Sequence, residues 1–297
     1  MSVIEPVQSA IFAPGALAGR VALVTGGGTG LGRATAVELA RCGARVVIAG
    51  RREEVLAEAG AEIAAASAQG EDGVDWISAD VRGAPGAESL IGEVLARCGQ
   101  LDVLVNNAGG QFFSPAELIA AKGWRAVWRL NVEGMLNMSH AAHAQAFARG
   151  RGGTIVNVTL SPHNGMPGMA HSGAARATVE ALTRELAELW REDGVIVSAV
   201  AAGHFETEVL AKYPASVRAG ASRSVPLGRL GTAQEHAWLV ALLAGPLGAA
   251  FTGSTVTLDG ARDNWYGPWP PPGLADESGE VPVEARKGSA RPHRARG

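Results

Sequence analysis

Cysteine, long apolar runs and clustered positive charge are all scarce in this sequence. Two cysteines among 297 residues, Cys42 and Cys98, exclude a disulfide framework and a cysteine-based metal centre, and we expect no metal site. No run reaches the roughly 18 apolar residues of a transmembrane helix. The first 20 residues lack a basic stretch, so we expect a cytoplasmic protein. A net charge of −3 with scattered arginines argues against nucleic-acid and membrane partners.

Strand-like apolar runs alternate with helical patterns along most of the chain. The runs cover residues 21–27, 44–50, 74–80, 101–109, 153–159, 195–203 and 253–260. Alternation of this kind predicts an α/β protein with a Rossmann-type doubly wound parallel sheet, because strands buried on both faces are continuously apolar. We expect an N-terminal arm over residues 1–17, a single catalytic domain over 18–260, and a C-terminal extension over 261–297 that is disordered from about residue 275. The weakly periodic segment 204–230 is a candidate lid.

Glycines follow the first expected strand in "TGGGTGLG", residues 25–32. Gly26 would allow a tight turn, Gly30 a close approach of the backbone to a pyrophosphate, and Gly32 close packing of helix on strand. Phosphate charge is favoured at a helix N-terminus. The strand, turn and helix context therefore predicts a dinucleotide site.

The end of the second expected strand indicates which dinucleotide is bound. An acidic residue there would bind the ribose 2′-hydroxyl of NAD, whereas this chain has Gly50 followed by Arg51 and Arg52. Arginine can pair with a 2′-phosphate, so we predict NADP(H); the alternative is two solvated arginines that open a helix. Asp80, at the end of the third strand, would accept from the adenine amino group or act as a helix N-cap.

Six motifs in order resemble the short-chain dehydrogenase/reductase family over residues 18–260: "TGGGTGLG", "DVR", "NNAG", "LNVEG", "VPLGRLGTAQE" and "FTGSTVTLDG". The resemblance implies a dimer or homotetramer. "AAGHFET" resembles the family's nicotinamide-flanking stretch, although Ala202 stands where proline is usual. Together with the arguments above, it implies that the cofactor is bound by Thr25, Gly26, Gly28, Thr29, Gly30, Leu31, Gly32, Arg51, Arg52, Asp80, Val81, Asn107, Ala108, Gly109, Gly110, Arg176, Gly203 and Thr207.

The usual catalytic tyrosine and lysine of the family are absent. Aligning Arg176 with the lysine puts Ser172 at the tyrosine position and Thr159 at the catalytic serine position. Ser172 and Arg176, four residues apart, would share one helix face. Serine is a far weaker acid than tyrosine, and a positioned acid contributes about 100- to 10,000-fold to a rate. We therefore expect a poor enzyme for ketones and alcohols.

Reduction of a C=C bond conjugated to a thioester does not need that tyrosine, because its product is an enolate. "AHSGAARA" is similar to peroxisomal trans-2-enoyl-CoA reductases and, more loosely, to 2,4-dienoyl-CoA reductases, whose tyrosine position holds Ser161 here. Hydroxyls of Thr159, Ser161 or Ser172 would bind the thioester oxygen, and His171 or His163 would supply the proton. The resemblance implies that Asn131 bends its helix and anchors water beside Arg176. Cations that could meet CoA phosphates are Lys212, Arg218 and Arg223.

Two other functions remain open. A carbonyl or alcohol oxidoreductase with an unusual acid would turn over plain ketones. A cofactor-binding sensor or scaffold would bind NADPH without transferring hydride.

Overall fold

The computed structural model describes residues 8–148, 151–161, 163, 168–211 and 221–264. Lys212, Arg218 and the extension beyond residue 264 lie outside these residues, as do residues 1–7 of the expected arm. In the described part, seven strands form one parallel sheet in the order β3-β2-β1-β4-β5-β6-β9. The strands are β1 (Val21–Thr25), β2 (Arg45–Gly50), β3 (Val74–Ser78), β4 (Val103–Asn106), β5 (Gly153–Leu160), β6 (Val195–Ala202) and β9 (Thr255–Leu258). Each lies in or overlaps one predicted range, so the predicted Rossmann-type α/β fold is confirmed.

Burial on both faces explains why the strand sequences are continuously apolar. All five residues of β1 are buried, and its Leu23 pairs with Val47 of β2 on one side and Leu104 of β4 on the other. Successive side chains of a strand point to opposite faces of the sheet. Leu23 accordingly belongs to one hydrophobic core and Val24 to another.

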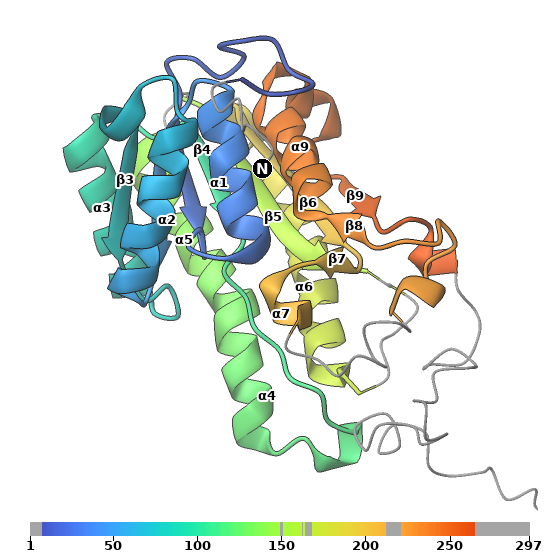
Figure 1. Cartoon of the computed structure of the whole chain (residues 1–297). Coiled ribbons are helices and arrows are strands. Elements are labelled where there is room, and N and C mark those ends of the chain that lie inside the picture. Colours follow the sequence, from blue (N-terminus) through green and yellow to red (C-terminus); the bar gives the residue numbers. More distant parts are fainter. Residues whose placement is uncertain (1–7, 149–150, 162, 164–167, 212–220, 265–297) are drawn as a thin grey trace, which may run out of the picture.

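Helices cover both faces of the sheet (Figure 1). The core that contains Val24 is closed by α1 (Gly30–Arg41), α2 (Glu53–Ala66) and α9 (Ala233–Ala244). The core that contains Leu23 is closed by α3 (Ala84–Cys98), α5 (Gly134–Ala142) and α6 (Ala170–Leu189). Helix α4 (Ala121–Trp128) joins α5 through a π-helical segment, Arg129–Glu133, and a second π-helical segment, His143–Phe147, ends α5. No helix in the described part has the length and apolar character to cross a bilayer.

The connection after β6 contains a small sheet that periodicity did not predict. Strand β7 (Phe205–Glu206) pairs in parallel with β8 (Gly231–Thr232), and α7 (Glu208–Ala211) follows β7. Thr232 and Glu235 form a capping box at the start of α9. The described ends of the candidate lid are thereby tied to the main domain. Short 3-10 helices are Gly70–Gly73, Ala116–Leu118, Arg191–Asp193, Pro246–Phe251 and Arg262–Asn264.

Candidate active site

A cavity of about 570 Å³ lies at the carboxyl ends of the central strands. Ligands of open α/β sheets bind at this edge, outside the carboxyl ends of the strands. The cavity is lined by every residue expected to bind the cofactor, from Thr25 and the glycine turn to Thr207. Sequence motifs that are up to about 180 positions apart therefore meet in one site.

The glycine turn has a shape that a larger residue would destroy. Gly26 and Gly30 have φ values of +67° and +53°, which favour glycine. A Cβ on Gly32 would lie 2.3 Å from Asn107 Nδ2 and 2.4 Å from the Gly26 oxygen. Bare backbone thus faces the cavity at the N-terminus of α1, and the residues present fit the pyrophosphate of a dinucleotide.

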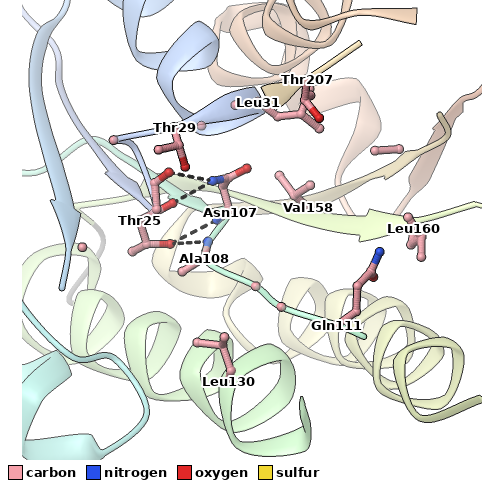
Figure 2. Close-up of a pocket in the computed structure, with 18 of the residues that line it drawn as sticks. Thr25, Thr29, Leu31, Asn107, Ala108, Gln111, Leu130, Val158, Leu160 and Thr207 are labelled. Atoms are coloured by element: carbon pink, nitrogen blue, oxygen red, sulfur yellow. Dashed lines mark hydrogen bonds between the residues drawn. The ribbon is translucent and has the colours of Figure 1, made fainter. Parts of the chain in front are cut away.

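Hydrogen bonds join the glycine turn to the segment after β4 (Figure 2). The backbone N–H groups of Asn107 and Ala108 each donate to Thr25 Oγ1 at 3.1 Å. Asn107 Nδ2 donates to the Thr25 carbonyl at 3.0 Å. Because both strands end at this edge, these bonds fix two walls of the cavity relative to each other.

Charged residues lie at the end of the cavity beside β2 and β3. Arg51 and Arg52 are exposed and line the wall. The hydrogen bond from the Arg82 guanidinium lowers the pKa of Asp80 to about 2, and the charge of Arg51 adds to this effect. The interpretation of Asp80 as a helix N-cap is wrong, because Gly83 holds that place before α3.

Arg176, which is half-buried, forms the wall at the other end of the cavity. Its Nη1 donates to the Val158 carbonyl at 2.7 Å, and its Nε has no partner within the described residues. A Cβ on Gly109 would lie 2.4 Å from Arg176 Nη2 and 2.7 Å from Asn131 Oδ1. Burial lowers the pKa of Arg176 to about 10, so the guanidinium is charged at neutral pH.

Asn131 braces the same wall from the π-helical segment between α4 and α5. Its side chain accepts from the Gly110 N–H at 3.0 Å and donates to the Gly110 carbonyl at 2.8 Å and the Val127 carbonyl at 3.0 Å. π-Helical bulges occur frequently at functional sites. In this protein the bulge accompanies an asparagine that holds the Gly109–Gly110 backbone beside Arg176.

Of the three expected catalytic hydroxyl residues, one lines the cavity and two are buried outside its wall. Thr159, at the end of β5, lines the cavity. Ser172 is fully buried and its hydroxyl donates to Gln111 Oε1 at 2.9 Å. Ser161 is also buried and donates to Asp259. Neither serine is among the described residues that line the cavity.

The two candidate histidines also differ. His171 is buried against the ring of Phe112, with centroids 4.2 Å apart, and lies outside the described cavity wall. Burial lowers its pKa, so its imidazole is neutral. His163 is exposed and contacts the carboxylates of Glu180 and Asp263. His171 and His163 as proton sources therefore stay predictions.

Sequence reasoning missed Gln111 and His204 as lining residues. Gln111 directly follows the glycines after β4, and Figure 2 shows its side chain among those that line the cavity. His204 lies two residues beyond the end of β6. Burial lowers the pKa of His204 to about 4, and the charge of Arg262 contributes, so this imidazole is neutral at physiological pH. Their positions just after strand ends could have indicated both residues.

The sheet order and the cavity define a Rossmann-type α/β protein, and comparisons with known proteins narrow the class. A family profile described as enoyl-(acyl carrier protein) reductase matches residues 26–261. The chain belongs to the short-chain dehydrogenase/reductase family of oxidoreductases, whose members use a nicotinamide cofactor.

Individual relatives match over most of their lengths. The probable 2,4-dienoyl-CoA reductase of Bacillus subtilis is 36% identical over 84% of this chain and 98% of its own. The peroxisomal 2,4-dienoyl-CoA reductase of Pongo abelii is 33% identical over 86% and 87%. The structure of a citronellol catabolism dehydrogenase from Pseudomonas aeruginosa has 40% identity and a TM-score of 0.75, over 85% of this chain and 98% of that one.

Proposed function

We propose that the protein is an NADP(H)-dependent oxidoreductase that reduces the C=C bond of an enoyl thioester. The observation that carries the proposal is the position of Ser172. The residue that aligns with the family's tyrosine is a buried serine whose hydroxyl is directed to Gln111, outside the described cavity wall, while the cavity itself is intact. Two relatives with the name 2,4-dienoyl-CoA reductase support the same class of reaction, and they add a conjugated dienoyl thioester to the candidate substrates.

The position of Ser172 matters because the two candidate reactions make different demands on the site. Reduction of a ketone produces an alkoxide that needs a proton from a positioned acid. Hydride addition to an enoyl thioester produces an enolate, whose oxygen needs hydrogen-bond donors and whose α-carbon needs a proton. A site without a tyrosine can perform the second reaction if a hydroxyl and a proton source remain.

The residues that would hold the cofactor are those of the glycine turn, with Arg51 and Arg52 for the 2′-phosphate and Arg176 for the ribose hydroxyls. The reduced nicotinamide supplies hydride when bound. Thr159 would bind the thioester oxygen, because this residue lines the cavity and its hydroxyl lies 3.3 Å from the Arg176 carbonyl. The apolar side chains of Phe113, Met169 and Leu210 also line the cavity and would exclude water from the enolate.

Self-association is part of the proposal. Helices α4 and α6 are in contact and carry the exposed side chains of Trp128 and Leu189. Exposed large apolar groups on adjacent helices support a subunit interface, and the family resemblance implies a dimer or tetramer.

Dehydrogenation of an alcohol is the second candidate, favoured by the 40% identity to the citronellol catabolism dehydrogenase. The test is oxidation of NADPH by the purified protein with a short and a long trans-2-enoyl-CoA and a 2,4-dienoyl-CoA. A panel of ketones, and NADP⁺ reduction with citronellol, are run beside it. Turnover confined to the thioesters supports the proposal. Ready turnover of ketones or alcohols favours the second candidate, and NADPH binding without any turnover would indicate a sensor or scaffold.

A further inference from the structure

A line of hydrogen-bonding side chains connects the cavity wall to the protein surface. Thr159 Oγ1 donates to Glu180 Oε1 at 3.0 Å. His163 Nε2 lies 3.0 Å from the same carboxylate oxygen. Exposure rises outward, since the Glu180 side chain is 12% exposed and the His163 side chain 36%. Each member is therefore in contact with the next, and the last is in contact with solvent.

The outer end of this line is held by the segment after β9. His163 Nδ1 and its backbone N–H both bond to the Asp263 carboxylate. The Asp263 backbone N–H donates to Asp259 Oδ2 at 2.8 Å, and the Ser161 hydroxyl donates to that same carboxylate. The imidazole is thereby oriented with one nitrogen toward the interior and the other toward Asp263.

The charges around His163 favour its protonated form. Glu180 faces it from α6 and Asp263 from the 3-10 helix Arg262–Asn264, while Arg262 and Asp259 flank Asp263. Burial by itself would lower the pKa of His163, but the hydrogen bond to Asp263 and the charges of Glu180 and Asp263 raise it above 6.5. A raised pKa keeps this imidazole loaded with a proton closer to neutral pH.

We propose that His163 and Glu180 relay a proton from solvent to the Thr159 hydroxyl and so replace the missing acid of the family. The inference rests on the proposed function and names its proton source. Hydride adds to the β-carbon with its electron pair, and the C=C electrons move to the thioester oxygen. When the enolate collapses, the α-carbon takes the Thr159 hydroxyl proton. The imidazolium of His163 gives its Nε2 proton to the ionised Glu180 carboxylate, which passes that proton to Thr159 Oγ1 and is left ionised as before. Water then reprotonates His163, so each turnover consumes one solvent proton.

Two polar, non-titrating variants break the relay at different places. H163Q keeps a polar side chain at the surface but cannot titrate, and E180Q keeps a hydrogen-bonding amide that cannot carry the proton. We expect each to lower kcat by about 100-fold, the low end of the range for general acid catalysis, with little change in KM. H143Q is the matched control. His143 Nε2 bonds to Asp193 at 2.8 Å and its ring stacks on Trp190, outside the described cavity wall, so H143Q should retain wild-type kcat.

The pH profile distinguishes a relay from a structural contact. The wild-type kcat should fall as pH rises through the His163 pKa, above 6.5, because the relay then loses its proton. H163Q should be uniformly slow and lack this fall. The relay would be overturned if the wild-type enzyme is active on enoyl-CoA and H163Q has the same kcat and the same decrease of kcat with rising pH. Wild-type enzyme inactive on every enoyl-CoA would instead overturn the proposed function.

An NMR titration of the imidazole tests the contact without turnover. E180Q removes a negative charge beside His163, so the pKa of His163 should be lower in E180Q than in the wild type. Identical titration curves in the two proteins would show that Glu180 does not contact His163 and would refute the relay regardless of the substrate.

Discussion

Replacement of Ser172 by alanine tests most directly whether Ser172 is the general acid of a ketone reductase or is dispensable, as we propose for the reduction of an enoyl thioester. The substitution removes one hydrogen bond, from Ser172 Oγ to Gln111 Oε1 at 2.9 Å. A neutral hydrogen bond contributes about 0.5–1.5 kcal/mol to stability. Gln111 is exposed, so its freed oxygen can bind water and no buried polar group is left unpaired. We therefore expect S172A to lower the free energy of unfolding by about 1 kcal/mol.

The expected effect of S172A on catalysis is small. If Ser172 were the general acid, its loss would lower kcat by about 100- to 10,000-fold. Since its hydroxyl faces Gln111 and Ser172 lies outside the described cavity wall, we expect a decrease below about 10-fold, well under that range. The assay is kcat for an enoyl-CoA with NADPH, and urea denaturation measures the change in stability.

T178A is the matched control on the same helix. Thr178 Oγ1 donates to the Ala174 carbonyl at 2.9 Å at an exposed site, so T178A also removes one hydroxyl hydrogen bond from α6. A hundredfold loss of kcat in S172A, with wild-type stability and with T178A fully active, would show that Ser172 is the acid and would refute the reasoning from its orientation.

Three further substitutions, one of them with a matched control, test the cofactor site and one helix cap. R51A should weaken NADPH binding about 10- to 150-fold, which corresponds to the loss of one charge-assisted hydrogen bond. Fluorescence titrations should show NADH binding nearly unchanged. Equal losses of affinity for NADPH and NADH would contradict the prediction of NADP(H). G32A should abolish tight binding, because its Cβ would lie 2.4 Å from a backbone oxygen, whereas G173A, where the added Cβ meets nothing within 4 Å, should bind normally. The hydrogen bond from Arg229 lowers the pKa of Glu235 to about 2, so its stabilisation is complete above the unfolded pKa of about 4.3 and is lost as pH falls toward 2. E235Q should flatten the dependence of the unfolding free energy on pH in this window. An unchanged dependence would show that the Glu235 carboxylate does not stabilise the fold through its lowered pKa.

Local patterns explain why the fold and the cofactor cavity could be predicted. The strands are separate apolar runs, and the glycine turn needs residues such as Gly26 and Gly32 at fixed places in the sequence. Each signal lies within a short stretch, and the rule that parallel strands bring their carboxyl ends to one edge assembles them. The residues that line the cofactor part of the cavity could therefore be predicted from short sequence motifs, without knowing how the helices pack.

The orientation of the remaining side chains depends on packing that no local pattern carries. Ser172 and Arg176 share a helix face, as their spacing predicts, but burial directs the serine hydroxyl to Gln111, 61 positions earlier. His163 meets Asp263 across 100 positions. Contacts of this kind are set by how α6 and the end of β9 pack on the sheet, so the sequence could propose His163 as a proton source but not its partners.

Arg176, which stands where the family has lysine, bears on the absence of the tyrosine as well. A buried guanidinium whose pKa is about 10 stays protonated at neutral pH, so it can orient ribose hydroxyls but is a poor donor of protons to a neighbour. Because the family's tyrosine depends on its neighbouring lysine for a lowered pKa, a tyrosine restored at Ser172 alone would still lack that partner. Under the proposed function the proton comes from another side, and the hydroxyl of Thr159, a residue of the cavity wall, is bonded to Glu180. On this proposal, the absence of the tyrosine–lysine pair and the hydrogen-bonded side chains Thr159, Glu180 and His163 are two aspects of one change in chemistry.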